Sequence, residues 1–390
     1  MAIEMTAPFE ELVERCTESI ESLDFAEASR WKHDAPGRAI AGCFPVYTPV
    51  ELFHAANVLP VGLTGGGNRL EIANADARFQ SFVCSIVKST LELAMVGKLD
   101  DFDGFVFHSI CDPARNLASV FARNFEHKRI EYIHFPQRFE PSHAIPYLEA
   151  EYERVLGWAA ELSGRRADDD DLLRSIKLYD AIRASMRRLY DFRREAPHKL
   201  GTRELYALAR YGNVVPPEDH LQTLGRALEL LQLREGKPKD RARLLIVGSF
   251  CEQPPLDLIA SIEDAGCYVV DDDFLLGRRF FKADVARTAR PIHDLAEAYV
   301  ERSVDSSVKH DTRHSKAAAL VDRVRAYGAD AVVVLTAKFC EPALFDYVLY
   351  REALHEARIP HVFLEFEEKM WLFDKIKTEI ETFVESLMFS

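Results

Sequence analysis

The sequence has no cysteine pair at the two-residue spacing that zinc ribbons and thioredoxin-like sites use. Its seven cysteines are odd in number and scattered over 390 residues, so a disulfide framework does not explain them. A P-loop is also absent, because the glycines at 65–67 are not followed by Lys and Ser or Thr at the required spacing. The chain therefore carries no ATP-binding motif of its own.

Long apolar runs are missing as well. None approaches the roughly 20 residues that span a bilayer, and the first residues lack the basic start and apolar stretch of a secretory signal. The net charge of -14 offers no counter-charge to nucleic acid or to an anionic membrane. We expect a soluble cytoplasmic protein, with no nucleic-acid or membrane partner, whose thiols are reduced, buried or bound to metal.

The sequence does contain an alternation of strand-like and helix-like segments, and 48 % of its residues are apolar. Strands separated by helices indicate a parallel sheet that is covered on both faces. This alternation stops over 145–237 and begins again near 243. We expect an α/β protein with two Rossmann-like parallel-sheet lobes, divided into a helical arm (1–35), a first lobe (36–144), a helical insert (145–240) and a second lobe with a C-terminal helix (241–390).

Three segments place a lone cysteine directly after an apolar strand. They read "GFVFHSICDP", "LLIVGSFCEQP" and "VVVLTAKFCEP", and they contain Cys111, Cys251 and Cys340. Ligands of open parallel sheets bind beyond the carboxyl ends of the strands, and a helix N-terminus lowers the pKa of a thiol. A single such cysteine is more often a small buried side chain. Three repeats instead favour thiolates that converge on a tetra-iron cluster.

The other informative stretch is "PVYTPVELFHAANVLPVGLTGGG". Pro49 and Glu51 open a helix whose N-terminus faces the same crevice, so Glu51 is a candidate proton-handling carboxylate. Spacing alone favours a simpler role, in which an acid in the first turn complements the helix dipole. Three other cysteines (Cys16, Cys84 and Cys267) are interpreted as packing residues, with Cys84 inside a helix expected over 79–97.

These motifs together resemble the benzoyl-CoA reductase and 2-hydroxyacyl-CoA dehydratase family of iron–sulfur proteins. The resemblance covers "PVYTPVEL", "SICDPARNL", "GSFCEQPPLDLIASIEDAGCYVVDDDF" and "KFCEPALFD". The third of these segments is most similar to the smaller, C or gamma, subunits of ATP-dependent benzoyl-CoA reductases.

The resemblance implies a [4Fe–4S] cluster and a set of partners. These are a larger homologous subunit, ATP-hydrolysing iron–sulfur activator subunits that hold the ATP and Mg, ferredoxin and an acyl-CoA substrate. The implied reaction reduces the ring of benzoyl-CoA to a cyclohexadiene carbonyl-CoA. Cys111 and Cys340 match cluster ligands, and Glu51 matches a carboxylate near the substrate.

The third cluster ligand stays open at this point. The first cluster cysteine of the family commonly lies four residues before the proline that is Pro45 here, whereas Cys43 lies two residues before it. Either Cys43, through a shifted loop, or Cys251 is expected to serve. Two other functions are compatible with the sequence: a 2-hydroxyacyl-CoA dehydratase subunit that eliminates water, and a non-catalytic subunit that carries a cluster or shapes its partner.

Several residues are candidate substrate contacts. Arg115, Arg278 and Arg279 are candidates for CoA phosphates. Side chains that would hydrogen-bond a thioester oxygen are His108, His134 and Lys338, although a structural role is expected more often for each of these three.

Overall fold

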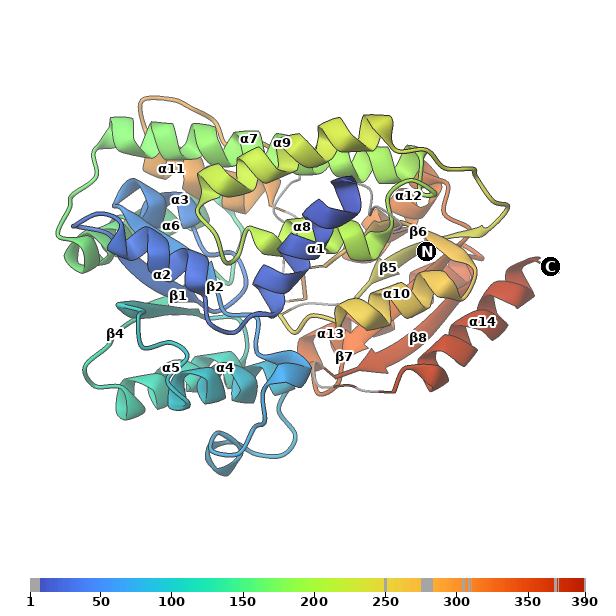
Figure 1. Cartoon of the computed structure of the whole chain (residues 1–390), viewed down its shortest axis with the longest axis horizontal. Helices are drawn as coiled ribbons and strands as arrows, with labels where there is room; N and C mark the ends of the chain where they lie inside the picture. The colour runs from blue at the N-terminus through green and yellow to red at the C-terminus, as the bar shows by residue number, and fades with distance from the viewer. Residues whose placement is uncertain are drawn as a thin grey trace, which may run out of the picture.

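The computed structural model describes residues 8–248, 251–274, 283–303, 306–307, 309, 311–367, 370 and 372–388. Within these residues the chain forms two four-stranded sheets in which every strand pair is parallel. Helices cover both sheets (Figure 1). The expected α/β class with two Rossmann-like lobes is confirmed.

The first sheet has the strand order β2-β1-β3-β4. Most of its residues are buried, as is typical of parallel strands that helices cover on both faces. The strands are β1 (Ala39–Cys43), β2 (Val58–Gly62), β3 (Gly104–His108) and β4 (Arg129–Ile133). The sequence pattern alone does not predict β2.

The second sheet repeats this topology with the order β6-β5-β7-β8. Its strands are β5 (Ala242–Val247), β6 (Cys267–Asp272), β7 (Ala331–Ala337) and β8 (His361–Phe366). In both sheets the chain order reverses beside the first strand, between β1 and β3 and between β5 and β7. Such a reversal opens a crevice at the carboxyl ends of the two strands.

Three helices follow strands of the first lobe. They are α3 (Val50–Ala55), α4 (Ser85–Met95) and α5 (Asp112–Asn124). Helix α5 packs against β3 and β4, and α4 packs against α5. Figure 1 shows α4 and α5 on one side of this sheet and α3 on the other.

Helices also precede the first sheet and connect the two sheets in sequence. The first pair is α1 (Pro8–Glu21) and α2 (Ala26–His33), and the connecting helices are α6 (Pro141–Ser163), α7 (Asp169–Glu195), α8 (Thr202–Tyr211) and α9 (Pro217–Leu233). Helix α1 packs against α8 and α9. Helix α7 contacts α3 of the first lobe and β6 of the second, so it joins the lobes (Figure 1).

The second lobe adds five helices and a π-helical turn at Ala298–Arg302. The helices are α10 (Leu256–Asp264), α11 (Pro291–Glu297), α12 (Lys316–Tyr327), α13 (Glu341–Glu356) and α14 (Asp374–Met388). Helix α11 leaves its own sheet and packs against α6 and α7. A main core of buried side chains runs through both lobes, and a smaller core lies between the second sheet, α12 and α13.

Among the described helices, none combines the length and apolar character that crossing a membrane requires.

Candidate functional site

Four of the candidate cysteines lie at the two places where the strand order reverses. Cys43 ends β1 and Cys111 follows β3, so these two flank the crevice of the first sheet. Cys251 and Cys340 follow β5 and β7 and flank the crevice of the second sheet. The repeated topology thus explains why similar motifs occur in both halves of the sequence.

A second grouping includes a cysteine that the sequence pattern assigns to packing. Cys84, Cys111 and Cys340 are each the N-cap residue of a helix, of α4, α5 and α13 respectively. In their thiolate forms Cys111 and Cys340 would each raise the pKa of the Cys84 thiol, so both lie near Cys84. We call these three cysteines the thiol trio. It draws two residues from the first lobe and one from the second.

The interpretation of Cys84 as a residue inside a helix is therefore wrong. The expected helix over 79–97 begins at Ser85, and Cys84 stands half-buried at its N-cap. Ser85 and the apolar helical pattern that starts at Ile86 are the sequence signal for this boundary. The sequence around Cys84 lacks the strand, Cys, acid and Pro pattern of Cys111 and Cys340, so it does not indicate a metal site.

The pKa values of Cys84 and Cys111 are raised, whereas the dipole at a helix N-terminus is expected to lower them. The pKa of Cys111 is raised to about 11, chiefly by burial and also by the Asp112 and Glu341 carboxylates, although a hydrogen bond from the Ala114 amide lowers it. Burial is also the main cause that raises the pKa of Cys84, with Glu252 adding to it. Desolvation outweighs the helix N-terminus, so the free thiols are protonated near neutral pH.

Cys43 and Cys251 make different contacts. The Cys43 thiol donates to the Ala41 carbonyl at 3.5 Å, and burial raises its pKa while Thr48 lowers it. The Cys251 thiol donates to the Pro45 carbonyl at 3.4 Å, across the lobes. The prediction that either is the third cluster ligand stays a prediction.

All seven cysteines lie in the described part of the chain, and none of them forms a disulfide. Within that part, no group of three or more His, Cys, Asp or Glu side chains is already arranged to hold a metal ion. The donor chemistry of the thiol trio nevertheless suits an iron–sulfur cluster, which takes three or four cysteine sulfurs.

Glu51 lies in a buried ionic network beside the first crevice. Its side chain is only 5 % exposed, and its Oε1 accepts from Nη1 of Arg183 in α7 at 2.7 Å. Arg183 also donates to Oδ1 of Asp180 at 2.8 Å. Glu51 and Arg183 line a cavity of about 90 Å³, and the tyrosines at 47, 152 and 299 lie around it. The pair thus brings a carboxylate and a guanidinium to one small pocket.

The other candidate substrate contacts have varied surroundings. His108 is fully buried, and its Nε2 lies 2.5 Å from the Phe44 carbonyl, while burial lowers its pKa to about 4. It is therefore a neutral residue that joins β3 to the segment after β1. Lys338 pairs with Glu367 at 2.7 Å in a half-exposed position. Arg278 and Arg279 lie outside the described residues.

A groove of about 610 Å³ lies directly beside Cys111. Arg115 and His134 line it together with Arg138, His143 and Asp112, so it brings two guanidinium groups together on a chain of net negative charge. The fold thus places the candidates Arg115 and His134 next to a member of the thiol trio. An anionic ligand that approached Cys111 would meet these side chains first.

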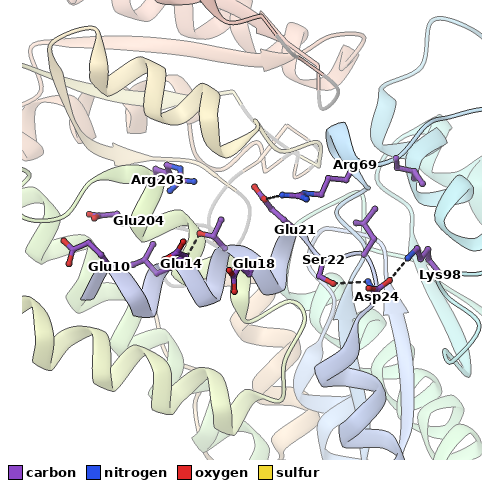
Figure 2. A pocket seen from close by; sticks show the side chains of 14 residues that line it. Glu10, Glu14, Glu18, Glu21, Ser22, Asp24, Arg69, Lys98, Arg203 and Glu204 are labelled. Atoms are coloured by element: carbon purple, nitrogen blue, oxygen red, sulfur yellow. Dashed lines mark hydrogen bonds and ion pairs between the residues drawn. The ribbon is translucent and has the colours of Figure 1, made fainter. Parts of the chain in front are cut away.

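A hollow of about 830 Å³ lies elsewhere, between α1 and α8 (Figure 2). Glu10, Glu14 and Glu18 of α1 line it, together with two ion pairs, Arg69 with Glu21 and Lys98 with Asp24. None of the candidate cysteines is among its lining residues. Its size alone does not make it a functional site.

The chain matches the family of the 2-hydroxyglutaryl-CoA dehydratase D-component over residues 45–387, and it belongs to that family. The C subunit of benzoyl-CoA reductase from Thauera aromatica is 36% identical over 97% of this chain and 98% of its own length. The beta subunit of lactoyl-CoA dehydratase from Anaerotignum propionicum is 27% identical over 90% of this chain and 92% of its own. The beta subunit of (R)-phenyllactyl-CoA dehydratase from Clostridium sporogenes is 26% identical over 91% and 94%. The family resemblance of the cysteine motifs is confirmed.

Proposed function

We propose that this chain is the iron–sulfur subunit of an ATP-dependent, ferredoxin-linked benzoyl-CoA reductase of the cytoplasm. The observation that carries the proposal is the thiol trio, in which three N-cap cysteines from two lobes lie near one another. The 36% identity to the C subunit of a benzoyl-CoA reductase over 97% of the chain supports the same reaction.

In this proposal Cys84, Cys111 and Cys340 hold a [4Fe–4S] cluster. When bound, such a cluster takes up and passes on single electrons at potentials as low as about -700 mV. Cys340 is buried and Cys84 and Cys111 are half-buried, so the protein shields much of the trio from water. The N-termini of α4, α5 and α13 present backbone N–H groups and a positive dipole end to the sulfurs.

The partners in this proposal are those that the resemblance implies. A larger homologous subunit would share the acyl-CoA substrate, and activator subunits would supply ATP and Mg, because this chain has no P-loop. Ferredoxin would supply the electrons. The cationic groove beside Cys111 suits the anionic groups of a CoA thioester.

Glu51 would handle protons during the ring reduction. Its place beside Arg183 at a pocket of about 90 Å³ supports this role, since the buried ion pair holds the carboxylate in a fixed position. Arg183 would hold the carboxylate oxygen in place rather than exchange a proton itself, because guanidinium groups stay protonated in proteins.

The proposal is tested by anaerobic purification with the partner subunits, followed by iron and sulfide analysis and EPR of the reduced sample. Loss of iron is expected in Cys84→Ala, Cys111→Ala and Cys340→Ala. Cys16→Ala, which changes a buried cysteine of α1, serves as the control that keeps its iron.

Two further variants decide the third ligand. Full iron in Cys43→Ala and Cys251→Ala, together with loss in Cys84→Ala, would assign Cys84. Iron loss in Cys43→Ala or Cys251→Ala, with full iron in Cys84→Ala, would restore the alternative. A folded wild-type complex without iron would overturn the cluster proposal.

A second candidate function is a 2-hydroxyacyl-CoA dehydratase subunit. The family name and three relatives that are named as dehydratase beta subunits favour it. The identities of those three relatives, 24% to 27%, are lower than the 36% to the reductase subunit. Assaying the loaded complex with benzoyl-CoA and with a 2-hydroxyacyl-CoA separates the two reactions.

A further inference from the structure

One buried acid lies outside the trio and outside the Glu51 network. Glu252 is 2 % exposed and follows β5 in the second lobe, yet its carboxylate bonds to the first lobe. Its Oε1 accepts from the Ser85 hydroxyl at 2.7 Å, and its Oε2 accepts from the Ile86 N–H at 3.1 Å. Ser85 and Ile86 are the first two residues of α4, directly after Cys84.

These hydrogen bonds supply a cap that α4 lacks within its own segment. The Cys84 side chain makes no capping hydrogen bond, although the first four N–H groups of any helix need partners. A carboxylate at this position also meets the positive end of the helix dipole. The second lobe therefore provides the N-terminal cap of a first-lobe helix.

The sequence neighbours of Glu252 also form hydrogen bonds with residues outside the second lobe. The Cys251 thiol donates to the Pro45 carbonyl of the first lobe, and the Gln253 side chain accepts from the Tyr206 hydroxyl of α8. Residues 251–253 thus attach the end of β5 to the first lobe and to a connecting helix. Cys340 follows the strand next to β5, so this attachment fixes it relative to Cys84.

We propose that Glu252 is a positioning residue that fixes Cys84 relative to Cys340 and that places a negative charge beside the Cys84 sulfur. The first part stands on the hydrogen bonds alone, and the second rests on the proposed cluster function. A fixed negative charge next to a cluster disfavours the addition of an electron, so it makes the cluster a stronger reductant. Such a reductant is what reduction of an aromatic ring requires.

The positioning role is tested on the unloaded full-length chain by hydrogen exchange at the Ile86 amide. Glu252→Ala removes both acceptor oxygens and is expected to speed exchange there at least tenfold, whereas Glu252→Gln keeps one acceptor and gives a smaller increase. Glu92→Gln is the matched control, because Glu92 is a buried acid of the same helix that accepts from Asn74 and Ala75. Unchanged exchange at Ile86 in Glu252→Ala would overturn the positioning role.

The charge role is tested on the anaerobically loaded complex by a redox titration followed by EPR. Glu252→Gln is expected to bind full iron and to shift the midpoint potential in the positive direction, while Glu92→Gln leaves it unchanged. An unshifted midpoint in a fully loaded Glu252→Gln complex would overturn the charge role. If the wild type takes up no iron, the proposed function and this charge role both fail, and the Ile86 exchange still decides the positioning role.

Discussion

At the scale of single residues, side chains that serve chemistry and side chains that join elements are mixed at the same strand ends. The Cys43 thiol ends a strand and bonds within its own segment, whereas Cys111, at the neighbouring strand end, belongs to the thiol trio. His108 is at the end of the same strand that precedes Cys111, and its buried ring bridges two segments. Position beyond a strand end is thus not sufficient to assign a ligand.

Glu51 gives the first prediction. Glu51→Gln should lower the free energy of unfolding by about 1–3 kcal/mol, because Arg183 loses one of its two carboxylate partners in a buried site. If Glu51 also handles protons, turnover of the assembled enzyme should fall at least tenfold. Urea unfolding and steady-state assays measure the two effects.

Asp180→Asn is the matched control for this variant, since Asp180 binds the same guanidinium at 2.8 Å. It should lose similar stability and keep most of the turnover. Equal loss of turnover in both variants would show that the ionic network, rather than the Glu51 proton, matters for activity.

His220 of α9 gives a prediction on pH. Burial lowers its pKa to about 4, from an ordinary value of 6.5, while its Nε2 bonds to the Leu208 carbonyl at 3.0 Å. Between these two values the unfolded chain binds a proton that the folded chain does not, so stability falls as the pH falls from 6.5 to 4. The full effect is on the order of 3 kcal/mol.

His220→Gln should therefore show a shallower decline of unfolding free energy between pH 6.5 and pH 4, measured by urea titrations at several pH values. Part of the decline should remain, because His108 has a similarly lowered pKa. A slope equal to that of the wild type would contradict the assignment of a buried neutral imidazole at position 220.

Single-residue assignments from the sequence depend on repetition. Cys111 and Cys340 are found because the strand, Cys, acid and Pro pattern occurs around both. Cys84 lies in no such pattern, and its approach to the other two is a tertiary contact between the first and second lobes. No spacing rule along the chain reports a contact of that kind.

At the scale of elements, the helix expected over 79–97 is found but begins later, at Ser85, and β2 is missed. Its sequence, VLPVG, has a proline in the middle, which argues against a strand that needs ladder hydrogen bonds on both sides. The structure places β2 at the sheet edge, where it pairs with β1 alone and Pro60 lies opposite Ala41. An edge position tolerates a residue that lacks an N–H.

Helix α7 gives the prediction at this scale. Asp168 caps it by accepting from the Asp171 N–H at 2.8 Å, and the Asp171 carboxylate accepts from the Asp168 N–H at 3.2 Å. Asp168→Ala should cost about 1 kcal/mol of unfolding free energy and speed hydrogen exchange in the first turn of α7. Urea unfolding and exchange mass spectrometry measure both.

Ser315→Ala removes the corresponding cap of α12, where the hydroxyl accepts from the Ala318 N–H at 3.2 Å. It should cost a similar or smaller amount, and its faster exchange should stay within α12. Faster exchange in α7 after Ser315→Ala, or none after Asp168→Ala, would contradict the separate roles of these caps.

At the scale of the whole molecule, two sheets of equal topology share one main core. The alternation of strands and helices predicts the two lobes, because that pattern is local. It does not predict the return of α11 to the connecting helix α6, where Arg290 pairs with Glu149 at 2.8 Å. Sequence order places residues 291–297 in the second lobe, and only side-chain packing brings them back. The domain boundaries at 35, 144 and 240 stay predictions.

A buried ion pair between a connecting helix and the second sheet gives the last prediction. Arg193 of α7 is 0 % exposed, and its Nη2 lies 2.8 Å from Oδ2 of Asp272 in β6. The other carboxylate oxygen of Asp272, Oδ1, accepts from the Tyr190 hydroxyl. Arg193→Met should cost about 3–5 kcal/mol, because it leaves the Asp272 carboxylate buried without its cation. The double variant Arg193→Met with Asp272→Leu should lose less than the sum of the two single losses. Urea unfolding followed by circular dichroism and by fluorescence measures all three variants.

Both probes should give one transition, since α7 packs on both lobes and the core is continuous. Strictly additive losses of unfolding free energy would show that the two side chains do not stabilise the junction as a pair. A separate early transition in Arg193→Met would show that this junction alone makes the lobes unfold together.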